Sequence, residues 1–138
     1  MNFDQQDISW PVFAEEPPNK VTFYNSTGAV IACIANGKPQ PSIHWITVDT
    51  NSFKFDHLLA HKFNPIFSAV KDVPGLRHTR PDGSLLFSPF SGDQYSEAIH
   101  SRIYRCVASN NHGTVVSRNV QIKGDLLRLI TVSLRRQY

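Results

Sequence analysis

The two cysteines of this chain, Cys33 and Cys106, constrain its fold more than any other feature. They lie 73 positions apart, so neither belongs to a Cys-x-x-Cys pair of the kind that binds zinc or exchanges disulfides. Both lie in segments whose apolar residues alternate with the period of a strand, "GAVIACIA" and "RIYRCVA". The alternation predicts two β-strands whose cysteines point into a core.

Two aromatic residues accompany the cysteines at characteristic distances. Trp45 follows Cys33 by twelve residues, within the alternating segment "PSIHWIT", and Tyr104 precedes Cys106 by two. This order is typical of an immunoglobulin domain, in which an indole packs on an inter-sheet disulfide and a tyrosine corner enters the second cysteine strand. The alternative, a free pair of buried thiols in a reducing compartment, is less favoured by the combined pattern.

Three further segments have the composition of strands. Residues 20–23 predict an edge strand, and residues 83–87 a strand whose Leu85 and Phe87 share a core face. The tetrad "NNHG" at 110–113 predicts a hairpin turn into a last strand over 114–122. In that strand we expect core positions at Val116, Val120 and Ile122, with Arg118 near the surface.

The predicted fold class is therefore all-β: an I-set-like, two-sheet antiparallel immunoglobulin sandwich with a long insertion after the tryptophan strand. We expect an N-terminal extension over 1–10, the domain over 11–123 with the inserted segment 47–71, and a C-terminal tail over 124–138. A disulfide that closes a loop of this length contributes about 4 kcal/mol to stability through the unfolded state. It also indicates an oxidising compartment.

Composition excludes several classes of function. The formal net charge is only +3, without the basic face that nucleic acid requires. The longest apolar run, residues 29–35, is far shorter than the roughly 20 residues that cross a bilayer. Residues 1–10 lack the pattern of a signal peptide, so we expect the chain to be part of a longer secreted or membrane-anchored protein.

The sequence predicts neither an enzyme nor a metal site. It contains no Gly-x-Ser-x-Gly motif and no cysteine outside the predicted disulfide, and we expect no cofactor and no small-molecule substrate. His57 and His61 have the spacing of two zinc ligands on a helix, but Leu58 stands where the motif needs a glutamate and no third ligand follows. The apolar residues from Phe55 to Val70 have helical spacing and fit a short amphipathic helix that Pro65 interrupts, or an apolar loop.

Asn25 is the single predicted glycosylation site, because Asn25-Ser26-Thr27 is the one Asn-x-Ser/Thr triplet in the chain. It follows the predicted edge strand, where a turn would expose it. In a secreted domain the asparagine would carry a glycan.

Longer stretches resemble a known family. Residues 11–46, the segment "DVPGLRHTRPDGSLLFSPF" and the segment "YSEAIHSRIYRCVASNNHGTVVSRNVQIKG" resemble the first immunoglobulin domain of arthropod Down syndrome cell adhesion molecules, over about two thirds of the chain. The resemblance implies a disulfide between Cys33 and Cys106, Trp45 as its packing partner, Tyr104 as the corner and Asn25 as a glycan site. Residues 1–10, 47–71 and 124–138 depart from it, either as lineage-specific protein or as translated intron sequence.

The resemblance also implies a function. The chain would be an extracellular module of a single-pass adhesion receptor that binds the same receptor on an opposing cell, supporting axon guidance and dendrite self-avoidance. It would lie on the extracellular face of the plasma membrane. The alternative is a secreted or surface immune-recognition protein that binds heterologous or microbial ligands.

Overall fold

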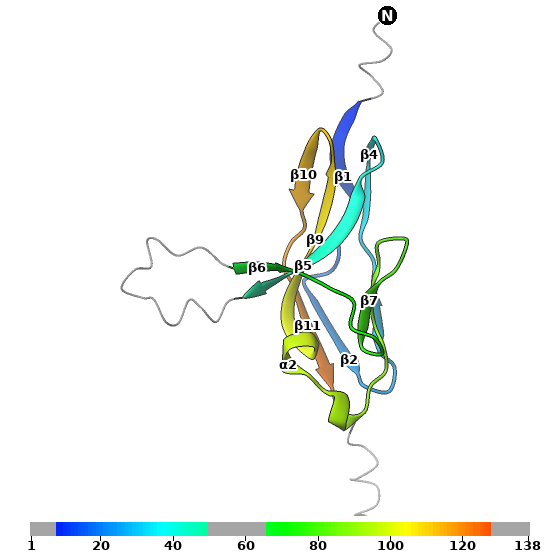
Figure 1. Ribbon diagram of the computed structural model, residues 1–138, viewed down its shortest axis with the longest axis vertical. Helices are drawn as coiled ribbons and strands as arrows, with labels where there is room; N and C mark the ends of the chain where they lie inside the picture. The colour runs from blue at the N-terminus through cyan, green and yellow to red at the C-terminus, as the bar shows by residue number, and fades with distance from the viewer. Residues whose placement is uncertain (1–7, 50–65, 128–138) are drawn as a thin grey trace, which may run out of the picture.

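The larger layer of the molecule is a six-stranded sheet. The computed structural model describes residues 8–49 and 66–127. In those ranges the strand order is β2-β11-β9-β5-β6, with β10 also paired to β9 (Figure 1). The strands are β2 (Lys20–Tyr24), β5 (Ser42–Asp49), β6 (Ile66–Ala69), β9 (Ser101–Asn110), β10 (Gly113–Val116) and β11 (Val120–Asp125).

The opposite layer is made of two smaller sheets, one with the order β3-β8-β7 and one with β1 paired to β4. These strands are β1 (Ser9–Glu15), β3 (Ala29–Ile31), β4 (Ile34–Lys38), β7 (Arg77–Thr79) and β8 (Leu85–Phe87). The strand predicted around Cys33 is thus divided at the cysteine, because its first part pairs with β8 and its second part with β1. The expected immunoglobulin-like sandwich is confirmed.

The N-terminal part of the chain passes from one layer to the other at two consecutive prolines. β1 pairs antiparallel with β4, whereas β2 pairs parallel with β11 of the larger sheet. Pro17 and Pro18 lie between the two strands, and proline interrupts a strand ladder because it has no backbone N–H. β2 is the predicted edge strand, and its pairing with β11 is the one parallel pairing recorded between described strands.

The core lies between the two layers and consists mainly of the inward-facing side chains of their strands. Burial of these side chains is the main favourable term in the folding of the domain. The buried core cluster comprises Phe23, Ile31, Cys33, Trp45, Leu85, Phe87, Phe90, Ile99, Tyr104, Cys106, Val120 and Ile122.

Two short helical turns close one end of the sandwich between β8 and β9. They are the 3-10 helix η3 (Gly92–Gln94) and the helix α2 (Glu97–His100), and both lie at the lower end in Figure 1. Ile99 and His100 are buried, so α2 packs its last two residues into the core. The chain leaves β11 at this same end (Figure 1).

The strand bounds correct the predicted domain bounds. β1 begins at Ser9 and β11 ends at Asp125, two residues outside the predicted limits of 11–123. The inserted segment predicted at 47–71 overlaps both β5 and β6, which pair antiparallel. The helix considered for this segment, which Pro65 would interrupt, lies outside the described residues, and so do His57 and His61; directly after Pro65, Ile66–Ala69 form strand β6, which was not predicted.

The core prediction is wrong at Val116, whose side chain is 45% exposed, while the neighbouring Ser117 is 2% exposed. Val116 pairs with Val107, and Val120 pairs with Tyr104. The last strand therefore advances four residues where β9 advances three, and the extra residue reverses the alternation. Val120 and Ile122 lie beyond the irregularity and are buried, whereas Arg118 is exposed at the surface.

Candidate functional site

The disulfide between Cys33 and Cys106 joins the two layers near the middle of the core. Its Cα atoms lie 6.5 Å apart, and both residues are almost completely buried. Trp45 is the register partner of Cys106 across β5 and β9, and its side chain is 1% exposed. Sulfurs this deeply buried act as a structural crosslink, because an attacking thiolate cannot reach them.

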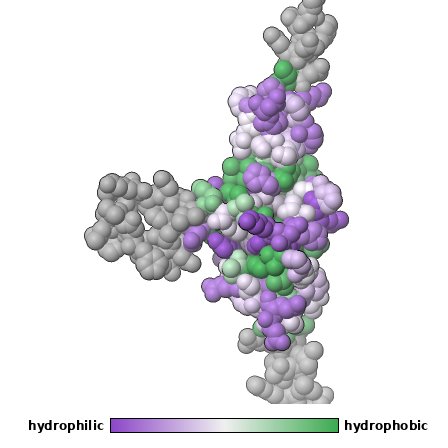
Figure 2. Space-filling view, in the orientation of Figure 1, coloured by the Kyte–Doolittle hydropathy of each residue, from purple (hydrophilic) through white to green (hydrophobic). Residues whose placement is uncertain are grey.

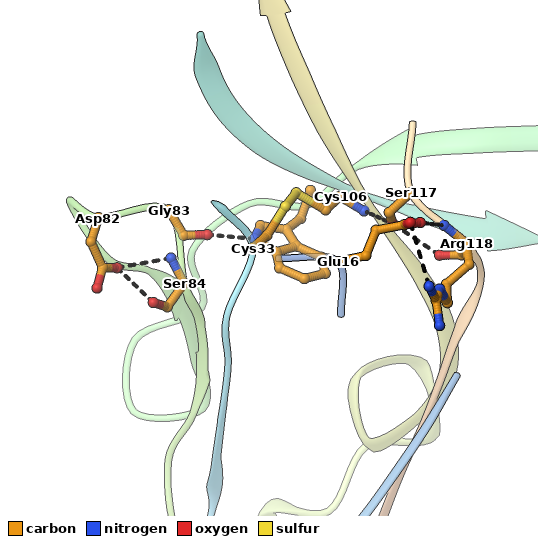
Figure 3. The surroundings of a disulfide bond; sticks show 9 residues. Glu16, Cys33, Asp82, Gly83, Ser84, Cys106, Ser117 and Arg118 are labelled. Carbon is orange, nitrogen blue, oxygen red and sulfur yellow. Dashed lines mark hydrogen bonds and ion pairs between the residues drawn. A yellow bond between two sulfur atoms is a disulfide. The ribbon is translucent and has the colours of Figure 1, made fainter. Parts of the chain in front are cut away.

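A tight turn before β8 holds the indole of Trp45. The Trp45 Nε1–H donates to the carbonyl of Gly83 at 2.8 Å, and Asp82 Oδ1 accepts from both the amide and the hydroxyl of Ser84 (Figure 3). The hydroxyl of Ser84 is the main cause that lowers the pKa of Asp82. Gly83 has a φ of +92°, and a Cβ there would lie 2.9 Å from that of Ile43, so only glycine fits.

A buried serine holds the backbone of Cys106 from the side of the last strand. The Cys106 amide donates to Ser117 Oγ at 2.9 Å, and the Ser117 amide donates to the Cys106 carbonyl at 2.8 Å (Figure 3). Next to it, Glu16 accepts from the backbone and side chain of Arg118, and the backbone hydrogen bond is the main cause that lowers the pKa of Glu16. The irregularity before β11 thus supports the disulfide strand.

Tyr104 forms the corner at the lower end of the core. Its hydroxyl donates to the carbonyl of Ile99 at 2.8 Å and accepts from Arg77 Nη1 at 3.0 Å. Burial raises the pKa of Tyr104, so the phenol stays protonated and keeps its donor. Arg77 Nη2 donates to the Lys71 carbonyl, but Arg77 Nε is buried without a hydrogen-bond partner among the described residues.

The hairpin turn after β9 fastens the N-terminal strand at the opposite end. Asn110 Nδ2 donates to the carbonyls of Ser9 and Pro39, at 2.9 and 3.0 Å. The indole of Trp10 lies directly over Gly113, where a Cβ would overlap its ring at 2.1 Å. The predicted turn at 110–113 therefore also connects β1 and the residue after β4 to the end of β9.

Asn25 holds three parts of the lower end together. Its Nδ2 donates to the Phe90 carbonyl at 2.9 Å, and its Oδ1 accepts from the Leu127 amide at 2.8 Å. The backbone of Asn25 bonds Asp125 and Phe90 as well. Its side chain is half-buried rather than free in a turn, although one Nδ2–H would remain for Phe90 if a glycan were attached. Glycosylation at Asn25 stays a prediction.

Replacing Asn25 with alanine is expected to lower the free energy of unfolding by about 1–3 kcal/mol, because it leaves the Phe90 carbonyl and the Leu127 amide without their partners. Urea unfolding of unglycosylated protein measures this loss. Thr27→Ala is the matched control, since it also removes the glycosylation triplet but loses only a local hydroxyl contact with the Tyr24 and Gly28 carbonyls, so the free energy of unfolding should fall by about 0.5–1 kcal/mol. Equal losses in the two variants would contradict the structural role of Asn25.

Two open grooves lie on the described surface, and both have mixed polarity. The larger, about 600 Å³, lies along β5, β9 and β11 beside α2 and includes Asp49, Glu97, Arg102 and Lys123. The other, about 450 Å³, lies beside the turn of Gly83. In the described ranges no group of three or more potential metal ligands occurs. Neither groove presents a catalytic arrangement such as a nucleophile with a base.

The exposed apolar side chains lie mainly on strands rather than in the two grooves. Along β1 and the residue before it, Ile8, Trp10 and Val12 are all more than half exposed. Figure 2 shows separate hydrophobic areas between hydrophilic ones on the face that it presents. A surface of this kind suits recognition of another protein more than binding of a small molecule.

The inter-sheet disulfide, the indole packed against its strand and the tyrosine corner define an immunoglobulin domain. No protein-family model matches the chain. It is 36% identical over 132 residues, 96% of the chain, to cell adhesion molecule Dscam1 of Drosophila melanogaster, and 37% identical over 82% of the chain to Dscam2 of the same organism. The chain is thus similar over most of its length to the N-terminal immunoglobulin domains of Dscam proteins, which confirms the resemblance seen in the sequence.

Solved structures agree with the sequence matches. The chain superposes on the N-terminal four immunoglobulin domains of Dscam1 isoform 7.44 with a TM-score of 0.72 and 38% identity, covering 87% of the chain and 26% of that structure. The corresponding values for the N-terminal eight domains of isoform 1.30.30 are 0.70 and 38%, with 86% and 15% covered. The chain spans only about 6% of the length of Dscam1.

These relatives are named as cell adhesion molecules, not as enzymes. Human DSCAM has the same description and is 30% identical over 91% of the chain. Among the described residues, no helix has the length and apolar character needed to span a membrane.

Several residues at these sites carry no recognisable signal in the sequence. Ser117 is buried only because of the irregularity before β11, and Asn110 acts on segments more than 70 positions away. Arg77 and His100 are polar residues in segments without regular alternation, yet both are buried. Only the Asn-Asn-His-Gly composition indicated that 110–113 would be a tight turn.

Proposed function

We propose that this domain is an extracellular module of an adhesion receptor that binds the same receptor on an opposing cell, and so supports axon guidance and dendrite self-avoidance. The observation that carries the proposal is the match to Dscam1, a cell adhesion molecule, over 96% of the chain. The parent protein would be anchored in the plasma membrane with this domain outside the cell.

The geometry is compatible with recognition rather than chemistry. The cysteines are crosslinked and buried, and the Tyr104 phenol is engaged with Ile99 and Arg77, so neither supplies a reactive group. Most of the exposed apolar side chains belong to strands, which present a rigid surface to a partner. Another solved Dscam structure concerns isoform specificity, which suits a family whose surfaces discriminate between partners.

A bead assay tests homophilic binding. Beads coated with the parent ectodomain are expected to aggregate with each other and to leave bare beads of a second colour single. The control is the same ectodomain with this domain removed, which separates its contribution from that of the remaining domains. Absence of aggregation by a folded ectodomain would contradict the proposal, and saturable binding of microbial surface preparations by the same beads would favour the immune-recognition alternative.

A further inference from the structure

His100 lies in an aromatic stack at the end of the domain where the chain leaves. It is the last residue of α2, and its side chain is completely buried. The ring stacks on Phe90, with centroids 3.9 Å apart and planes inclined by 19°, and on Tyr95, at 5.5 Å and 22°. The stack holds the loop before α2 against the core.

A single backbone hydrogen bond defines the protonation state of the ring. The Ser96 amide lies 3.0 Å from His100 Nδ1. A backbone N–H can only donate, so Nδ1 must present its lone pair, and the neutral ring then carries its proton on Nε2. Nε2 is itself buried and has no hydrogen-bond partner among the described residues. A second proton would have to enter at Nδ1, in place of the bond from Ser96.

The surroundings of His100 on balance disfavour a positive charge. Burial is the main cause that lowers the pKa of His100, the backbone of Ser96 raises this pKa by less, and the positive charge of Arg77 on β7 lowers it further. From β2 and β11 the neighbours at this position are the uncharged Phe23 and Gly124. The titratable groups nearby are the phenols of Tyr95 and Tyr104, while Glu97 on α2 is exposed and lines the outer groove with Lys123.

Contacts connect the ring to the exit of the chain. Phe90, which stacks on His100, accepts from Asn25 Nδ2, and Asn25 Oδ1 accepts from the Leu127 amide. On the other side, a Cβ at Gly124 would lie 3.4 Å from His100 Cβ, so β11 packs closely against the histidine. A change at His100 is therefore expected to affect residues 124–127 both through Phe90 and Asn25 and through the direct packing of β11.

We propose that His100 is a pH-sensitive latch: its neutral ring holds residues 90–100 and the exit segment 124–127 in place, and its protonation releases them. Acidification would thereby loosen the exit segment 124–127. The latch goes beyond the adhesive function and does not depend on it. Histidine is the side chain whose charge changes most readily between pH 5 and 8.

The direction of the pH dependence follows from the lowered pKa. The unfolded or released segment binds a proton more readily than the closed one. The latch is therefore at full strength above the ordinary histidine pKa of about 6.5 and weakens as the pH falls through the lower pKa of the closed state. At neutral extracellular pH it stays closed.

Amide hydrogen exchange of the intact chain at pH 7.4 and pH 5.0 tests the proposal. After correction for the intrinsic pH dependence of exchange, protection of amides in 90–100 and at Leu127 should be lower at pH 5.0 than at pH 7.4, because protonation of His100 favours the released segment. Protection of the Cys106 amide should fall much less, because Ser117 holds it in the core. Equal protection of the latch segment at both pH values would overturn the proposal.

A variant and a direct titration complete the test. His100→Phe keeps an aromatic ring in the stack but cannot be protonated, so the pH-dependent loss of protection should disappear. The control is His44→Phe, at an exposed position of β5, which should still show the pH-dependent loss of protection. If His100→Phe does not fold, NMR titration of the wild-type ring decides. A His100 midpoint equal to that of His44, or a pH effect that persists in His100→Phe, would refute the latch.

Discussion

Replacing Cys33 and Cys106 together with alanine is expected to lower the free energy of unfolding by about 4 kcal/mol, the largest effect of any change at the sites described above. The crosslink spans 73 positions, and its removal allows the unfolded chain many more conformations. Domains of this size are typically stable by only about 5–15 kcal/mol. The variant should therefore unfold at a much lower urea concentration, as measured by circular dichroism.

Reduction of the wild type is the matched control for this prediction. The sulfurs are buried in the folded domain, so a thiol reductant should act mainly on unfolded molecules. In reductant, the wild-type unfolding midpoint should move to near that of the alanine variant, whose own midpoint should not change. A loss of less than about 1 kcal/mol in the variant would show that the crosslink contributes little, contrary to the chain-entropy argument.

The central part of the fold could be predicted because its signals are local and periodic. Alternation placed Trp45 on a strand, and the spacing of Tyr104 and Cys106 indicated the corner. In the structure Trp45 and Cys106 are register partners, and Leu85 on β8 is completely buried. A pattern of period two determines which face is buried as long as the strand is regular.

The same reasoning failed where the strand was irregular. Val116 has the correct composition for a core position, but one extra residue before Val120 turns it outward and brings Ser117 inward. No propensity scale contains this information, because the irregularity is determined by pairing with β9. Strand β6 was missed for a similar reason: a segment of four residues, three of them apolar, fits a helix or a strand, and only pairing with β5 decides between them.

The polar residues of the lower end were beyond prediction from one sequence. His100 and Arg77 are buried by contacts outside their own helix and strand, including Tyr104, Phe90 and the Lys71 carbonyl. Their composition alone favours exposure. Buried polar groups of this kind identify where a fold depends on particular partners, and these partners can be tested in pairs.

Tyr104→Phe is expected to lower the free energy of unfolding by about 2–4 kcal/mol. The phenol both donates to Ile99 and accepts from the guanidinium of Arg77, so its removal leaves the buried Ile99 carbonyl without its donor and takes away one of the two acceptors of Arg77, the other being the Lys71 carbonyl. Arg77 has no carboxylate partner among the recorded contacts of the described residues, so both of these acceptors are neutral. Urea unfolding measures the loss, and Tyr24→Phe, at a half-exposed tyrosine, should be close to neutral.

A double-mutant cycle separates the cation from the packing. Arg77→Met removes the charge and the unpartnered Nε while keeping an apolar chain, so we expect it to cost only about 1 kcal/mol. Combined with Tyr104→Phe, it should cost about 1–2 kcal/mol less than the sum of the single losses, because the phenylalanine no longer takes an acceptor away from a buried charge. Additive losses would mean that Arg77 finds solvent or another acceptor, and that Tyr104 stabilises the corner through Ile99 alone.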